Sequence, residues 1–415
     1  MTPKISVEQR RARLIARHHL GQPAESATSA VSAMIVLHAT DPVTVYLSAW
    51  ARTRMASADE LDEAIYARRE VIRMLGMRRT MFLVPAPLVP VVQRACTDDV
   101  ARRMRQGLER DLEKGGVGDG DAAAWLRDVG EGVLRALTAR GSGFAADLSA
   151  QEPRLRTALE YAPGKSYGGT ANITSRVLML LSAEGLIVRG DRRGGWSSGQ
   201  FKWFPAQSWM PEPRDFAGSV GAAAAGGDPA GLLGSTLTAA AARAELARRW
   251  LLAFGPAPAS DLQWWAGWTA GQAKAALAAL PVTEVDLDGR PGVALATDTE
   301  PLPARSSSAA PGAVLLPALD PTPMGWQSRE WFLGEHGPAL FDRTGNIGPS
   351  IWWDGRIVGG WAQRATGEVV FRLLEDVGAD AATAVEAEAE RLRAWLGDAR
   401  VTPRFRTPLE RELVA

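Results

Sequence analysis

The stretch from Thr174 to Trp203 reads TSRVLMLLSAEGLIVRGDRRGGWSSGQFKW and decides the fold. Its first part has apolar residues three and four positions apart, which predicts a helix from Thr174 to Glu184, and Gly185 is a typical helix stop. Two short apolar runs follow, 186–189 and 200–203, separated by a turn rich in glycine and arginine. These runs predict the two strands of a β-hairpin. The stretch is therefore expected to fold as a helix followed by a hairpin.

The same order of elements occurs three times along the chain, each time as helices followed by a hairpin. The helices expected in the three copies are 7–19, 44–52 and 58–67, then 122–139, 145–149 and 174–184, then 242–254, 260–267 and 270–280. The strand pairs expected are 71–77 with 80–84, 186–189 with 200–203, and 282–287 with 293–295. A helix-turn-helix with a β-hairpin is a winged helix, and three copies favour a surface that fits DNA. Winged helices also serve as protein-interaction modules, so a second interpretation stays open.

The C-terminal part of the chain follows a different pattern, with short apolar runs between turns rich in glycine and aspartate. The strands expected there are 314–317, 339–341, 350–353, 357–361, 369–373 and one that starts at Arg400, with a helix at 381–396. Asp354-Gly355 is typical of a tight hairpin turn. This pattern predicts a small β-barrel or a strongly curved sheet.

Two segments rich in glycine, alanine, proline or serine, 210–236 and 297–311, read as linkers. They lead to a division into four domains, namely three winged helices at 1–115, 116–210 and 237–296 and a β-barrel-like domain at 312–415. The fold class expected is therefore α+β.

The composition limits the possible partners. The chain has 415 residues, with 47 Lys and Arg against 47 Asp and Glu. This balance argues against a uniformly basic surface, although it allows a basic groove offset by acidic faces. One cysteine and four scattered histidines are too few for a disulfide or a zinc cluster, so neither a metal nor another cofactor is expected. His18 and His19 are expected on a helix surface, and Cys96 as a buried thiol.

No targeting or membrane segment is recognisable in the sequence. The first residues are basic and lack the apolar core of a signal peptide, and no apolar run is long enough to span a bilayer. The sequence thus predicts a protein of the cytoplasm. A monomer that associates with the nucleoid is expected as well.

Several short motifs are shared with one protein family. They include His38-Ala39-Thr40-Asp41-Pro42, the run from Arg78 to Phe82, Leu319-Asp320-Pro321, the run from Trp353 to Trp361, and the ending from Thr402 to Pro408. In these motifs, over nearly its whole length, the chain resembles the winged-helix DNA-binding family of the AlkZ/YcaQ-type DNA glycosylases, which unhook interstrand cross-links. The resemblance implies a C-shaped protein of three winged helices and a barrel, with duplex DNA in its concave channel.

The resemblance also implies a polar strip that faces the damaged nucleotide. Those glycosylases typically carry a Gln-apolar-Gln strip, and this chain has His38-Ala39-Thr40 instead. In extended backbone His38 and Thr40 point to the same face. As a glycosylase strip, neutral His38 would accept a proton from water, Thr40 would orient that water, and Asp41 would stabilise positive charge on the sugar. Asp41 is equally typical of a helix cap, and His38 of a hydrogen-bonded structural residue.

The family's activity would be hydrolysis of the N-glycosidic bond of N7- or N3-alkylated or cross-linked purines in double-stranded DNA, for repair or for self-resistance to a genotoxin. The alternative is a winged-helix protein that binds DNA without cleaving a bond, as a regulator or a lesion shield. Residues expected to contact DNA are Arg78, Arg79, Lys165, Tyr167, Arg192, Arg193, Lys202, Arg356 and Gln363. For Arg78 and Arg79, solvated turn charges are the simpler interpretation.

Overall fold

The computed structural model describes residues 2–161, 164, 168–210, 237–301, 312–403 and 405–415. Contacts between Cα atoms group the chain into two compact units. Unit 1 comprises Met1–Val71, Phe82–Pro85 and Arg243–Ala415, and unit 2 comprises Ile72–Met81 and Ala86–Ala242. Among the described residues, no helix is long and apolar enough to cross a membrane.

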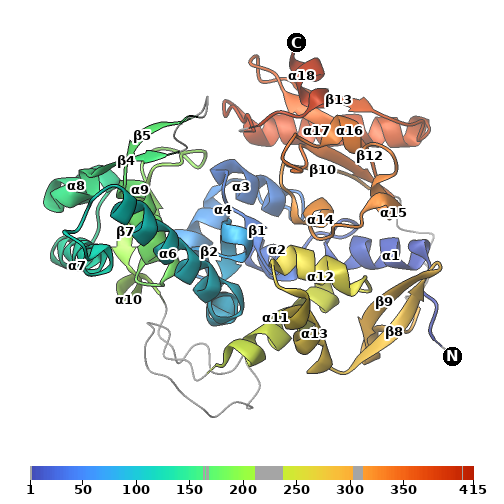
Figure 1. The fold of residues 1–415 in the computed structure, drawn as a ribbon. Coiled ribbons are helices and arrows are strands. Elements are labelled where there is room, and N and C mark those ends of the chain that lie inside the picture. Colours follow the sequence, from blue (N-terminus) through green and yellow to red (C-terminus); the bar gives the residue numbers. More distant parts are fainter. Residues whose placement is uncertain (1, 162–163, 165–167, 211–236, 302–311, 404) are drawn as a thin grey trace. The chain divides into compact units, whose positions relative to one another are not determined.

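The first part of unit 1 is mostly helical (blue in Figure 1). Its elements are α1 (Val7–Arg17), α2 (Ala27–Ala33), β1 (Leu37–His38), α3 (Pro42–Trp50), α4 (Asp59–Asp62), a π-helical turn (Glu63–Ala67) and β3 (Met81–Pro85). Each of the three expected helices is present, and before the third the hydroxyl of Ser57 accepts a hydrogen bond from the backbone N–H of Asp59 (3.2 Å). The additional helix α2 starts at Ser26, whose side chain accepts a hydrogen bond from the backbone N–H of Ser29.

A helix–hairpin group follows the segment 211–236. It contains α11 (Ala239–Phe254), α12 (Ala259–Ala266), α13 (Ala270–Ala278), β8 (Val282–Leu287) and β9 (Arg290–Leu295). Thr269 begins α13 with a capping box, because its hydroxyl accepts from the Gln272 backbone while the Gln272 side chain accepts from the Thr269 backbone. Asp288 and Gly289 both have positive φ, as the tight turn between the two strands requires. The third predicted copy is therefore confirmed at the level of its helices and strands.

The C-terminal part of unit 1 is an antiparallel sheet of four strands in the order β10-β11-β12-β13. The elements are β10 (Ala313–Leu316), α14 (Pro321–Met324), α15 (Glu330–Leu333), α16 (Gly337–Leu340), β11 (Ser350–Trp353), β12 (Arg356–Gln363), β13 (Val369–Leu373), α17 (Ala379–Leu396) and α18 (Pro408–Val414). Helix α17 packs on β10 and β13, and α18 packs on β12 (Figure 1).

The predicted β-barrel is wrong, because within the described residues this sheet stays open. Two expected strands are absent. The segment 339–341 is mostly helical, since Pro338 lies in the first turn of α16, where its missing N–H and fixed φ cost nothing. The segment after Arg400 has no ladder partner, and the backbone N–H of Val401 instead donates to the side chain of Gln363 (2.8 Å). Within the described part of the chain, no strand therefore connects β10 with β13 at the two edges of the sheet.

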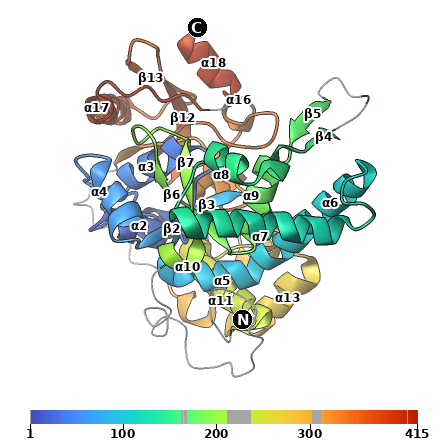
Figure 2. The same ribbon diagram turned by 90° about the vertical axis from the view of Figure 1, so that its left-hand side faces the viewer.

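Unit 2 holds the second predicted copy (Figure 2). Its elements are β2 (Val71–Leu75), the 3-10 turns Met77–Arg79, Ala86–Leu88 and Pro153–Arg156, α5 (Val89–Val92), a π-helical turn (Gln93–Thr97), α6 (Asp98–Lys114), α7 (Ala122–Arg140), α8 (Ala145–Gln151), β4 (Ala158–Tyr161), β5 (Gly169–Asn172), α9 (Thr174–Ala183), β6 (Ile187–Arg192), β7 (Phe201–Pro205) and α10 (Ala206–Trp209). Gly185 has φ +72, which confirms it as the residue that ends α9. The core joins α6, α7, α8 and α9 to the hairpin through leucines and Trp203.

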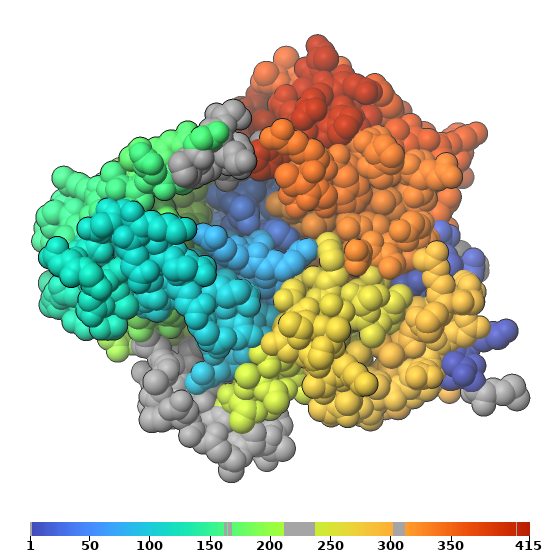
Figure 3. Space-filling model, in the orientation of Figure 1, coloured from blue at the N-terminus to red at the C-terminus, as the bar shows by residue number. Residues whose placement is uncertain are grey.

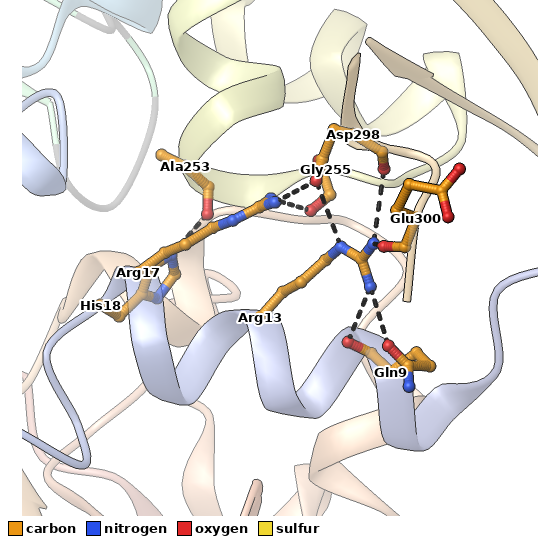
Figure 4. A network of polar contacts seen from close by, with 8 residues as sticks. All are labelled: Gln9, Arg13, Arg17, His18, Ala253, Gly255, Asp298 and Glu300. Carbon is orange, nitrogen blue, oxygen red and sulfur yellow. Dashed lines mark hydrogen bonds and ion pairs between the residues drawn. The ribbon is translucent and has the colours of Figure 1, made fainter. Parts of the chain in front are cut away.

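A polar network anchors α1 within unit 1 (Figure 4). The guanidinium of Arg17 donates to the carbonyl oxygen of Gly255 (2.7 Å) and pairs with Asp298 (2.5 Å). Arg13, whose side chain is 1% exposed, pairs with the same carboxylate (3.4 Å) and donates to the carbonyl oxygen of Glu300 (2.7 Å). The Asp298 carboxylate and backbone carbonyl oxygens thus hold the arginine face of α1 against the loop after α11 and the segment after β9.

His18, at the end of α1, is fully buried rather than on the helix surface. Its Nε2 is 3.0 Å from the carbonyl oxygen of Ala253, and its Nδ1 is 3.0 Å from the hydroxyl of Thr322. A carbonyl oxygen only accepts, so Nε2 carries the hydrogen and Nδ1 accepts from Thr322. Burial, reinforced by the positive charge of Arg52, holds the pKa of His18 well below its ordinary value. Cys96 is buried, as expected.

We expect His18 to make the protein less stable as the pH is lowered. In the unfolded chain the imidazole binds a proton below about pH 6.5, whereas the folded protein does not until its depressed pKa is reached. Stability from this group is therefore complete above about pH 6.5 and falls by up to about 1.4 kcal/mol per pH unit below it. Urea unfolding at several pH values measures this slope, and His18→Gln should reduce it.

The comparison with His18→Gln is needed because other buried groups titrate in the opposite sense. Burial raises the pKa of Asp261 and of Glu410, so these carboxyls favour the folded state as pH falls. Both carboxyls are present in wild type and in His18→Gln, so their contributions cancel when the two pH dependences of the free energy of unfolding are subtracted. Equal slopes for wild type and His18→Gln between pH values near 5 and 6.5 would contradict the assignment.

Candidate active site and nucleic-acid contacts

The predicted catalytic segment begins on strand β1. Leu37 pairs with Leu83 and His38 pairs with Phe82 in an antiparallel register with β3. The imidazole of His38 lies 4.9 Å from the ring of Phe82, centroid to centroid, and the residue is 9% exposed. Packing on β3 therefore fixes the ring and leaves it a narrow exposed edge.

Thr40 and Asp41 follow where the strand has ended. Thr40 lies in a bend and is exposed, so it differs from His38 in access to solvent. Asp41 is the N-cap of α3, and its Oδ1 accepts from the backbone N–H of Val43 (3.0 Å). Burial raises the pKa of Asp41, and this hydrogen bond partly opposes the rise. The capping role predicted as one alternative for Asp41 is thus present, and a carboxylate in poorly solvated surroundings also acts more strongly on nearby charge.

A small cavity lies beside Asp41, within unit 1. Its volume is about 20 Å³, and it is lined by Asp41 and Thr44 of α3 and by Gln363, Arg406 and Glu410 among others. That is room for about one water molecule and much less than a purine needs. The cavity fits a bound water but not a base.

Two residues expected to contact DNA are engaged within unit 1. Gln363 is 6% exposed, and its amide donates to the carbonyl oxygens of Gly367 (3.3 Å) and Ala399 (3.1 Å). Its side-chain oxygen also accepts a hydrogen bond from the backbone N–H of Val401, so Gln363 has a structural role in the C-terminal sheet. Arg356, beside the tight turn of the β11–β12 hairpin, pairs with Glu375 (2.9 Å), which offsets its charge.

The first predicted wing carries Arg78 and Arg79 at its tip. Both are exposed, with φ of +53 and +60, in the turn between β2 and β3. Left-handed backbone at two successive arginines is uncommon and marks a tight turn. Lys165 and Tyr167 lie outside the described residues.

The second hairpin gathers cations around an aromatic ring. The guanidinium of Arg193 lies 4.3 Å from the ring centroid of Phe144, and the ammonium of Lys202 lies 5.8 Å from the same ring. The Nε of Arg192 donates to the carbonyl oxygen of Gly195 (2.8 Å), which orders the turn. Arg193 and Lys202 are therefore brought together at the start of α8, while Arg192 stabilises the loop.

One cation of this hairpin was not among the predicted contacts. Arg189 pairs with Trp203 in the register of β6 and β7, and its guanidinium lies 5.1 Å from that ring. The sequence contained a signal for this position, because side chains alternate along a strand and Arg189 is on the same side of β6 as the buried Ile187.

The described residues contain no group of acidic, histidine or cysteine side chains that fits a metal ion.

In the space-filling view of Figure 3, α12 (yellow) lies directly against the C-terminal part of unit 1 (orange), where the carboxylate of Asp261 accepts from the backbone N–H groups of Gln327 (3.1 Å) and Ser328 (2.9 Å).

The chain was similar to known proteins in two comparisons. The family described as "DNA glycosylase AlkZ-like" matches residues 31–395. The solved structure of the Streptomyces sahachiroi DNA glycosylase AlkZ is similar with a TM-score of 0.69 and 21% identity, over 97% of this chain and 99% of that one. A comparison with curated proteins gave no match. At that identity the structural likeness shows the fold alone, and the family match over most of the chain carries the assignment. The chain belongs to the AlkZ-like DNA glycosylase family.

Proposed function

We propose that this protein is a monofunctional DNA glycosylase that hydrolyses the N-glycosidic bond of N7- or N3-alkylated purines. The observation that carries the proposal is the family match at residues 31–395, which spans the segment from His38 to Asp41. That segment combines a fixed imidazole, an exposed hydroxyl and a partly desolvated carboxylate within four residues.

The chemistry asks little of the protein. An alkylated purine is already a cation, so it leaves C1′ as a neutral base and takes the electron pair of the glycosidic bond. Water then adds to C1′, its proton passes to His38, and the products are the free base and an abasic site. Thr40 orients the water and Asp41 stabilises the cationic sugar, so that positioning and electrostatics supply most of the rate. No metal or cofactor enters this scheme.

The DNA would be held by the helix–hairpin groups acting as winged helices. Two of these groups supply basic wings, whose cations at Arg78 and Arg79 and at Arg193 and Lys202 are exposed or partly exposed. Contacts to phosphates would give affinity for duplex DNA without sequence preference, falling steeply with salt. Cross-linked or bulky alkylpurines and a monomeric state belong to the same proposal.

A DNA-binding protein without catalysis is the second candidate, and one observation favours it. His38 and Thr40 replace the two glutamines typical of the glycosylases, and the His38 ring is 9% exposed against Phe82. In that case the protein would shield lesions or regulate a promoter. The two candidates share the DNA surface and differ only in bond cleavage.

Release of base from a duplex that contains N7-methylguanine separates the two candidates. We expect wild-type protein in excess to form abasic sites faster than the spontaneous rate, detected by cleavage of the strand in alkali. A duplex with a bulky N7 adduct should be tested beside it, because a labile methylated base needs little help. If neither base is released above the spontaneous rate while the duplex is bound, the binding protein is the correct function.

A further inference from the structure

A cavity of about 330 Å³ lies in the second helix–hairpin group, entirely within unit 2. Its walls come from the start of α8, from α9 and from the β6–β7 hairpin, elements that lie side by side in Figure 2. The volume falls in the range of about 300–1,000 Å³ that small-molecule sites occupy. Neither the cavity nor its lining contains a residue of the His38 to Asp41 segment.

The lining combines aromatic rings with two guanidinium groups. Phe144 and Trp203 supply rings, and Arg189 and Arg193 supply charge. Arg193 stacks on Phe144 at 4.3 Å, and Arg189 lies 5.1 Å from Trp203. Rings with adjacent arginines bind bases by stacking and phosphates by charge.

The charge of Arg189 is not offset by an acid. Its Nη2 donates to the sulfur of Met179 (3.3 Å), and no described carboxylate lies within ion-pair distance of either Arg189 or Arg193. Other arginines of the same unit are paired, for example Arg105 with Glu184 (2.6 Å). Burial, together with repulsion by Arg73, lowers the pKa of Arg189 to about 10. A largely desolvated cation next to another cation costs free energy, which a bound anion would recover.

We propose that this cavity binds one nucleotide, with its phosphate between Arg189 and Arg193 and its base against the aromatic wall. The chemistry fits an unstacked nucleotide of a DNA strand and also a free nucleotide. The DNA-borne form rests on the proposed function, since it requires that the protein bind DNA. In that form the cavity favours duplexes that are already distorted.

The test compares three ligands in binding titrations of the full chain: a paired duplex, the same duplex with one unpaired nucleotide, and deoxyadenosine monophosphate. We expect wild type to bind the interrupted duplex about tenfold more tightly than the paired one, the size of one base–aromatic stack. Arg189→Met should bring the two affinities together and remove binding of the monophosphate. The methionine keeps an apolar stem beside Met179, and urea unfolding checks that the variant is folded.

Two further variants control for general effects. Arg127→Gln removes one exposed charge from α7, so it should weaken both duplexes alike and leave their ratio unchanged. Phe144→Leu keeps both guanidiniums, so it should weaken deoxyadenosine monophosphate more than inorganic phosphate. Deoxyadenosine, which lacks the phosphate, should bind far more weakly than its monophosphate.

The three ligands together show whether the cavity takes a free nucleotide or a nucleotide of a DNA strand. Binding of the monophosphate without preference for the interrupted duplex identifies a free nucleotide as the ligand, whereas a preference for the interrupted duplex that is lost in Arg189→Met identifies a nucleotide of DNA. The proposal is overturned if wild type shows neither, or if Arg189→Met keeps the wild-type ratio. Base release is measured on the same proteins, so absent excision with intact nucleotide binding counts against the proposed function alone.

Discussion

Asp320→Asn should lower the free energy of unfolding by about 3–5 kcal/mol, because it leaves Arg52 as a buried, uncompensated charge. Both side chains are 0% exposed, and the guanidinium holds the carboxylate with two bonds, of 2.8 Å and 2.7 Å. Ser48 and the backbone N–H of Thr322 complete the shell of Asp320. Urea unfolding of wild type and variant measures the loss.

Two controls separate the charge from the side chain. Asparagine is nearly isosteric with aspartate and can still accept from Thr322, so the helix cap of α14 is retained. Arg52→Met in the same chain removes the orphaned cation, and the double variant should recover a large part of the lost stability. Glu375→Gln breaks the partly exposed pair with Arg356 and should change stability by about 0–1 kcal/mol. A double variant as unstable as the single one would contradict the argument.

The repeated helix–hairpin pattern could be predicted because it depends on local signals. Gly185 ends α9, Thr269 begins α13, and Asp288-Gly289 forms the turn between β8 and β9. Each of these acts on its own neighbours in the chain, so the sequence alone contains the information. The same holds for the four strands of the C-terminal sheet.

The sequence predictions were wrong or incomplete where contacts between residues far apart in the chain determine the structure. Helix α6 (Asp98–Lys114) is strongly amphipathic but lies after the expected hairpin, where the repeated pattern left no place for it. Closure of a barrel depends on which sheet edges meet, and the segment at Arg400 and Val401 is held by side-chain hydrogen bonds rather than by strand pairing. The sequence does not reveal the burial of His18, because its partners, Ala253 and Thr322, are far away in the chain.

The sequence identifies the segment that forms the candidate site, but it does not predict which residues surround that segment in the fold. The motif from His38 to Asp41 marks β1 and the start of α3, yet its spacing does not reveal that Phe82 packs on the imidazole. Gln363 and Arg356 carry polar groups suited to DNA, but their partners lie within the C-terminal sheet and its neighbours. Burial and pairing are properties of the folded chain, and they decide which polar residues remain available to a ligand.

His38→Ala should slow base release at least about tenfold, since a positioned acid–base group is typically worth roughly 10²–10⁴ and a cationic base needs less help. Affinity for duplex DNA should change little, because the imidazole makes no phosphate contact in the proposed scheme. The measurement is single-turnover excision of N7-methylguanine and of a bulky N7 adduct, with a binding isotherm for each variant. His38→Gln, which introduces the residue typical of the family, should retain more activity than His38→Ala.

Asp41→Asn separates the two possible roles of the Asp41 carboxylate, stabilisation of the cationic sugar and capping of α3. Asparagine caps a helix about as well as aspartate, so α3 and the stability of unit 1 should be preserved while the negative charge is lost. If Asp41 stabilises the cationic sugar, excision slows although the fold does not change; if it only caps α3, excision stays at the wild-type rate. Should His38→Ala excise both bases as fast as wild type, the glycosylase can stand, but the proton acceptor must be another group.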